Sequence, residues 1–70
     1  MTGAAEVRIS GRGGLFVADA ATIDGPWLHV SGRWRTRAGA NHSELRYSDE
    51  AAYTWPASEV AEIRWREATA

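Results

Sequence analysis

Alternation of apolar and polar residues with a period of two constrains the fold of this chain more than any other feature. It is clearest from Trp27 to Arg37. Successive side chains of a β-strand point to opposite faces, so this pattern predicts a strand with one buried face and one exposed face. The apolar side of the segment consists of Leu28, Val30, Gly32 and Trp34, and the polar side consists of His29, Ser31, Arg33, Arg35 and Arg37.

Shorter segments with extended or alternating patterns are separated by turn sequences. The strands expected besides residues 27–37 are residues 6–10, 15–23, 43–48 and 53–55. A bulge is expected at Asp19. Residues 11–14 contain three glycines and predict a tight turn, and Asp24-Gly25-Pro26 is typical of a hairpin loop. Short strands joined by such turns indicate an all-β, antiparallel fold.

The C-terminal segment fits two structures. Pro56 to Glu59 is typical of a helix start, whereas residues 61–66 alternate for six positions, as a strand does. We favour a single helical turn at residues 56–59 followed by a strand at residues 60–66. The alternative is an α+β fold, in which an antiparallel sheet carries a C-terminal helix at residues 56–68.

The segment from Tyr53 to Ile63, YTWPASEVAEI, resembles the end of SH3-like barrels. In those folds a strand leads into one helical turn, and a closing strand then pairs with the first strand. The resemblance is one of strand order over most of the chain and involves no diagnostic motif. It implies a small five-stranded antiparallel barrel. The chain lacks the aromatic and acidic signature of peptide-binding SH3 domains, so recognition of proline-rich ligands is not implied.

The composition indicates one small domain with an aromatic-rich core. Of the 70 residues, 44% are hydrophobic, but 13 of these are alanine and only 11 are Leu, Ile, Val or Phe, so the four tryptophans supply bulk. We expect residues 1–5 to be disordered, residues 6–67 to form the domain and residues 68–70 to be a tail. The predicted core is Val7, Ile9, Leu15, Val17, Leu28, Val30, Trp34, Leu45, Tyr47, Ile63 and Trp65.

Several kinds of chemistry are excluded or disfavoured. The chain has no cysteine, which excludes disulfides, thiolate-bound zinc and cysteine nucleophiles. His29 and His42 are too few for a histidine-rich metal site, and we find no catalytic constellation, so we expect no enzymatic activity and no cofactor. No signal peptide or bilayer-spanning run is visible, which predicts a cytoplasmic protein. All eight basic residues are arginine, as is typical of a high-G+C bacterial genome or its phages.

The candidate binding residues lie on the polar side of the predicted central strand. The period of two places Arg33, Arg35 and Arg37 on one face, together with Trp27 and His29. Neighbouring strands are expected to add other arginines to this face: Arg46, and in a wider set Arg8, Arg64 and Arg66. One interpretation is that these arginines form cross-strand ion pairs with exposed glutamates. The other is that they form a basic stripe for an acidic partner.

These residues predict a non-enzymatic interaction module. Its partner would be another protein or a second copy of the chain, bound through Trp27, His29, Arg33, Arg35, Arg37 and Arg46. The alternative is a nucleic-acid-binding barrel that uses the arginine row of the central strand. Nine acidic residues against eight arginines, and a pI near 6.0, count against this alternative. We expect neither a membrane nor a small-molecule substrate as partner.

Overall fold

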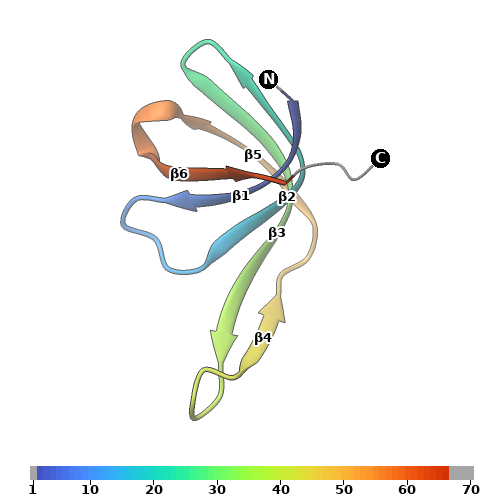
Figure 1. Cartoon of the computed structure of the whole chain (residues 1–70), viewed down its shortest axis with the longest axis vertical. Helices are drawn as coiled ribbons and strands as arrows, with labels where there is room; N and C mark the ends of the chain where they lie inside the picture. The colour runs from blue at the N-terminus through green and yellow to red at the C-terminus, as the bar shows by residue number, and fades with distance from the viewer. Residues whose placement is uncertain (1, 67–70) are drawn as a thin grey trace.

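The computed structural model describes residues 2–66, which form one antiparallel sheet with a short 3-10 turn (Figure 1). The strands are β1 (Thr2–Ile9), β2 (Leu15–Asp24), β3 (Trp27–Ala38), β4 (Glu44–Tyr47), β5 (Ala51–Pro56) and β6 (Val60–Trp65). The 3-10 turn η1 (Ala57–Glu59) lies between β5 and β6. Within residues 2–66, no helix is long and apolar enough to cross a bilayer. The predicted tail at residues 68–70 lies outside the described residues.

The 12-residue strand β3 organises the sheet because it pairs with three other strands. One edge of β3 pairs, through residues 27–35, with the whole length of β2. The other edge pairs with β5 at residues 27–32 and with β4 at residues 35–38. On the far side of β2 come β1 and then β6, so the last strand lies beside the first. The predicted all-β antiparallel fold is therefore confirmed.

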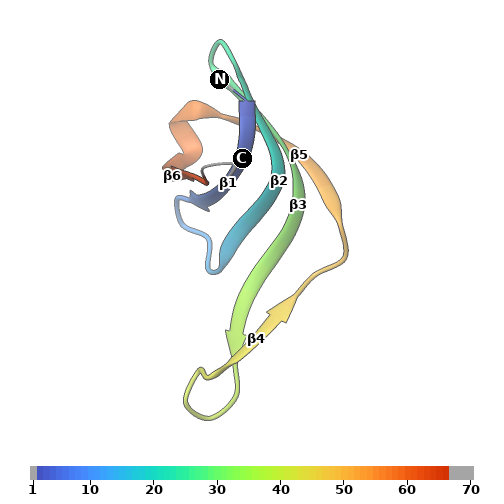
Figure 2. The same cartoon turned by 45° about the vertical axis from the view of Figure 1, so that its right-hand side comes forward.

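The predicted barrel is not formed. The sheet has six strands instead of five, and it curls without closing, as Figure 2 shows. Closure would require β6 to pair with the strand at the opposite edge. Within the described residues β6 pairs only with β1, while β4 and β5 share one edge of β3. The predicted helical turn followed by a strand is confirmed, and the alternative of a C-terminal helix is wrong for residues 60–65.

The core lies on the inner face of the curled sheet and centres on aromatic rings. Phe16 is fully buried. Its ring packs edge-to-face against Trp34, Tyr53 and Trp55, with centroids 5.2, 5.5 and 5.4 Å away. Such edge-to-face pairs stabilise beyond the area that they bury. The buried residues are Ala5, Val7, Ile9, Phe16, Ala18, Ala21, Leu28, Val30 and Trp55, with Trp34, Tyr53, Val60, Ile63 and Trp65 partly buried against them.

The predicted core is correct for β1 and β3 and wrong for β2 and β4. On β2 the structure buries Phe16 and Ala18, while Leu15 and Val17 lie on the other face. Residues 15–18 are all apolar, so the alternation that identifies an inner face is missing there. On β4, Leu45 and Tyr47 are 43% and 54% exposed. The physical reason is that β4 pairs with the end of β3 beyond the core, where nothing covers either face.

Residues 2–5 belong to a strand, in contrast to the predicted disorder of residues 1–5, of which Met1 lies outside the described residues. Strand β1 begins at Thr2, and Ala5 is fully buried between Ala18 on β2 and Trp65 on β6. Alanine and glycine give no visible alternation, so only strand pairing on both sides reveals that this segment is buried. The predicted bulge at Asp19 is confirmed by a register shift between Ala18 and Ala20.

Candidate functional site

Three arginines of β3 project from the outer face of the sheet, opposite the core. Residues directly across an antiparallel ladder share a face. Arg33 lies across from Val17 on β2, Arg35 lies between Leu15 on β2 and Tyr47 on β4, and Arg37 lies across from Leu45 on β4. Apolar side chains therefore flank the arginine row on both sides. We refer to Arg33, Arg35, Arg37, Leu45 and Tyr47 as the Arg–Tyr face.

The arginines of the Arg–Tyr face have no acidic partners within residues 2–66. The ion pairs of this part of the chain join Arg8 and Arg64 to Glu62, Arg46 to Glu44, and His29 to Asp24. The one side-chain hydrogen bond of the row runs from Arg37 Nη1 to the backbone oxygen of His42, at 3.3 Å. Ion pairing thus accounts for Arg8 across strands and for Arg46 and Arg64 within their own strands, but not for the row on β3.

Two open hollows extend the Arg–Tyr face across β2. One of about 370 Å³ is lined by Val17, Asp19, Arg33 and Tyr47. The other, of about 270 Å³, is lined by Arg8, Gly14, Leu15, Arg35 and Arg37. Arg8 thus joins two arginines of the row around one hollow, although it also contacts Glu62 at 3.9 Å. The resulting surface combines guanidinium groups, one phenol ring, aliphatic side chains and the carboxylate of Asp19.

Arg46 does not belong to this face, which corrects its predicted place. On β4, Arg46 lies across from Thr36, and both residues have the parity opposite to Arg35 and Arg37. Its guanidinium contacts Glu44 at 3.4 Å instead. The pairing register of β4 decides this outcome, because a shift by one residue exchanges the two faces of a strand. The same register places Leu45 and Tyr47, which the sequence pattern predicts for the core, beside the arginines.

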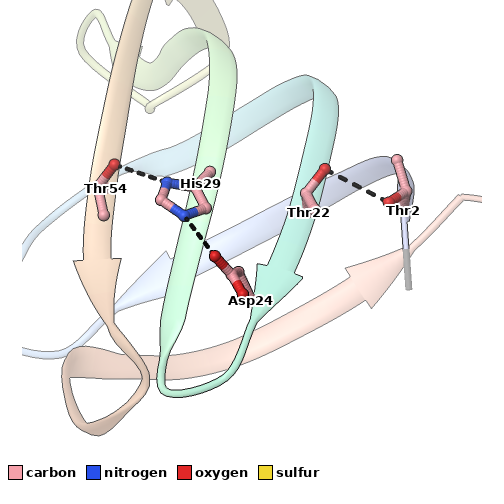
Figure 3. A network of polar contacts seen from close by, with 5 residues as sticks. All are labelled: Thr2, Thr22, Asp24, His29 and Thr54. Atoms are coloured by element: carbon pink, nitrogen blue, oxygen red, sulfur yellow. Dashed lines mark hydrogen bonds and ion pairs between the residues drawn. The ribbon is translucent and has the colours of Figure 1, made fainter.

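Trp27 and His29 occupy the other end of β3. The His29 ring lies between two side chains, with Nδ1 2.9 Å from Thr54 Oγ1 and Nε2 3.8 Å from Asp24 Oδ2 (Figure 3). His29 and Arg35 are six residues apart, or about 20 Å along a strand. The predicted set of binding residues is therefore divided between two separate places on the sheet.

The Asp24, His29 and Thr54 side chains form a carboxylate–imidazole–hydroxyl set, the residue types of an acyl-transfer triad. Their surroundings do not support that chemistry. The His29 and Asp24 side chains are 47% and 80% exposed, and the Asp24–His29 separation of 3.8 Å exceeds a hydrogen bond. The arrangement links β2, β3 and β5 on the outer face. Within residues 2–66, no group of three His, Cys, Asp or Glu residues can hold a metal ion.

Trp27 lies on the rim of an apolar hollow at the open end of the curled sheet. It is 47% exposed, and Ile23 beside it is 42% exposed. The hollow measures about 300 Å³, and its wall includes Val60 and Ile63 of β6. The structure thus shows the indole of Trp27, one of the predicted binding residues, half exposed at an end of the sheet that remains open.

The fold and the site define a small all-β protein with an antiparallel sheet and an exposed basic and aromatic face. The chain matches no known protein-family model, no curated protein and no solved structure. The function of the protein is therefore inferred from the geometry of these residues.

Proposed function

We propose that the chain is a non-enzymatic binding module whose Arg–Tyr face engages an acidic segment of a partner protein. The observation that supports it most is the row Arg33, Arg35 and Arg37, which has no carboxylate partner among residues 2–66. Guanidinium groups bind carboxylates in bidentate geometry, and such bonds are stronger than neutral hydrogen bonds. A partner carboxylate would supply the ion pairing that residues 2–66 do not provide.

The neighbours of the row favour a protein ligand. Tyr47 and Leu45 are 54% and 43% exposed, directly beside Arg35 and Arg37. Arginine and tyrosine are enriched among the residues that dominate protein interfaces. A segment that carries both acidic and apolar side chains matches a row of guanidinium groups flanked by apolar groups. The formal net charge of −1 makes the basic character local to this face instead of global.

A second candidate is single-stranded nucleic acid, because an exposed tyrosine stands among arginines. Bases stack on aromatic rings while guanidinium groups bind phosphates. Asp19 lines the same hollow as Tyr47 and Arg33, and its carboxylate would repel a phosphate backbone, which is charged at every nucleotide, whereas a peptide can place an apolar side chain there. The pI near 6.0 also lies well below that of typical nucleic-acid-binding domains. We therefore rank this candidate second.

The test compares Arg35→Gln with Arg46→Gln. Both variants remove one positive charge from the same hairpin, but Arg46 lies on the opposite face. The isotope-labelled protein is titrated with a synthetic peptide of alternating glutamate and phenylalanine while amide shifts are recorded. We expect shifts centred on residues 33–37 and 45–47. Arg35→Gln should weaken binding by about tenfold, as loss of a central interface residue does, whereas Arg46→Gln should leave it unchanged.

A single-stranded oligonucleotide is titrated in parallel at two salt concentrations. Saturable binding that weakens with salt, without binding of the peptide, would favour the second candidate. If neither ligand shifts the amides of the Arg–Tyr face, or if Arg46→Gln weakens peptide binding as much as Arg35→Gln, the proposal is wrong.

A further inference from the structure

The first and last strands carry the same three-residue pattern of charges. It reads Glu6-Val7-Arg8 on β1 and Glu62-Ile63-Arg64 on β6. The antiparallel register places Glu6 across from Arg64, Val7 across from Ile63 and Arg8 across from Glu62. Arg8 Nε lies 3.9 Å from Glu62 Oε1. An acid–apolar–arginine triplet is therefore its own complement when two strands run antiparallel, since the central residues face each other and the charges match on both sides.

Strand β6 presents this triplet on an edge with no strand partner. It is the last strand in the order β4-β3-β2-β1-β6 and lies beside β1 in Figure 1; within the described residues it pairs only with β1. The N–H of Arg66 donates to the backbone oxygen of Ala4 at 2.9 Å. Backbone groups alternate in direction along a strand. The backbone N–H and C=O groups of Arg64 and Glu62 thus face β1. The same groups of Ile63 and Trp65 face away from the sheet, where they can bind another strand.

We propose that β6 pairs with β6 of a second copy of this chain, antiparallel and about a two-fold axis at Ile63. In that register the outward N–H and C=O of Ile63 bond to the same groups of the second copy. Glu62 of each copy then faces Arg64 of the other on the outer face. Both charge pairs repeat the pairing that β1 and β6 already make within one chain. A two-fold interface requires such a self-complementary surface.

The apolar side chains around β6 also favour β6 of a second copy as its partner strand. Ile63 and Trp65 are only partly buried against the core. The apolar hollow at the open end of the sheet lies along β6, between Val60 and Ile63 on one side and Ile23 and Trp27 on the other. A strand added to β6 brings a second Ile63 and Trp65 to the inner side of the sheet. It would cover apolar surface that the open end of the sheet leaves exposed.

Two double variants with exchanged charges test the proposal. Arg8→Glu/Glu62→Arg preserves the charge pairing between β1 and β6 but gives β6 two arginines, which repel their own copies. Glu6→Arg/Arg64→Glu also preserves the internal pairing and gives β6 two glutamates. Both double variants keep the formal net charge of −1, so the internal sheet and the overall charge are matched to the wild type.

Sedimentation velocity is measured from about 1 µM to about 1 mM protein, the range of weak to moderate association. We expect the wild type to shift from monomer to dimer with rising concentration. Each double variant alone should remain monomeric, and an equimolar mixture of the two should restore the dimer. A wild type that is monomeric throughout, double variants that associate as the wild type does, or a mixture that stays monomeric would each overturn the proposal.

A measurement on the wild type keeps the proposal testable if a double variant fails to fold. Hydrogen exchange at the Ile63 amide should become slower as the protein concentration rises, because its outward N–H becomes bonded in the dimer. The Arg64 amide faces β1 and serves as the control. Exchange at Ile63 that does not depend on concentration would contradict pairing through β6. If a strand of another protein occupied this edge instead, the pure protein would likewise show no concentration dependence.

Discussion

Phe16 is the side chain on which the packing of the core depends most. It is fully buried and touches the aromatic rings of three other residues, which come from β3 and β5. Tyr53 and Trp55 in turn stack with centroids 5.1 Å apart, and Trp34 Nε1 donates to Tyr53 Oη at 3.2 Å. With few aliphatic residues in the chain, these rings fill the space that leucine and isoleucine usually fill.

Phe16→Ala should unfold the protein or bring it to the edge of unfolding. Truncation of a buried phenylalanine costs about 3–5 kcal/mol. A domain of this size has a free energy of unfolding of about 3–5 kcal/mol. Thermal and urea denaturation followed by circular dichroism measure the loss. Leu45→Ala is the control, since Leu45 is 43% exposed and its truncation should change stability by less than about 1 kcal/mol. A cooperative melt of Phe16→Ala near that of the wild type would refute the assigned core.

Gly32 allows β2 and β3 to approach closely next to the bulge at Asp19. It is buried on the inner side of β3, across from Ala18. A Cβ at this position would overlap the backbone oxygen of Val17 and lie 2.8 Å from Ala18 Cα. Both obstacles are backbone atoms, which cannot move aside as a flexible side chain can.

Gly32→Ala should therefore lower the free energy of unfolding by about 1–3 kcal/mol, the usual cost of overpacking. The matched control is Gly13→Ala, because a Cβ at Gly13 meets nothing within 4 Å and its backbone is not left-handed. That change should leave stability unchanged or raise it by a few tenths of a kcal/mol. Urea titrations of the two variants decide the matter, and equal midpoints would contradict the close approach at Gly32.

At the scale of the elements, β4 and the last four residues of β3 form an arm that extends beyond the core (Figure 2). All four residues of β4 are exposed. Two hydrogen bonds between Trp34 and Ser48 join this arm to the rest of the sheet. The N–H of Ser48 donates to the backbone oxygen of Trp34, and the N–H of Trp34 donates to Ser48 Oγ, each at 3.0 Å. The arm carries most of the Arg–Tyr face, so the surface proposed for binding is built on the least buried part of the sheet.

Amides of β4 should exchange with solvent much faster than those of β2 near Phe16. Segments with few buried contacts open with a free energy far below that of global unfolding. Hydrogen exchange followed by NMR at several pH values compares the two groups. If residues 44–47 are protected as strongly as residues 16–18, the arm is part of the cooperative core, and its description as a weakly supported extension is wrong.

At the scale of the whole molecule, the open sheet gives this small protein two separate surfaces. The Arg–Tyr face lies on the outer side of β3 and β4, while the free edge of β6 lies beyond β1 at the other end of the strand order. The two proposals depend on different residues and can fail independently. Arg35→Gln tests the face and leaves the charges of β6 intact. Both double variants leave the row on β3 intact, and Glu6→Arg/Arg64→Glu also leaves Arg8, which lines the hollow beside Arg35 and Arg37, unchanged.

The sequence by itself determined where most strands and turns lie and which chemistry is excluded. Alternation, glycine and proline act locally, so β3, the hairpin loop after Asp24 and the turn η1 before β6 were predictable. The absence of cysteine is a property of composition. The N-terminal part of β1 was missed because alanine and glycine carry too little contrast to show which face is buried.

Only the tertiary structure decided which faces the strands present and that the sheet stays open. Residues 15–18 are apolar at every position, so the burial of Phe16 depends on pairing with β1 and β3. The place of Tyr47 beside Arg35, and of Arg46 on the opposite face, depends on the register of β4. Register and closure arise from contacts between residues far apart in the chain, and a shift of one residue reverses every face. Local pattern carries no information about such contacts.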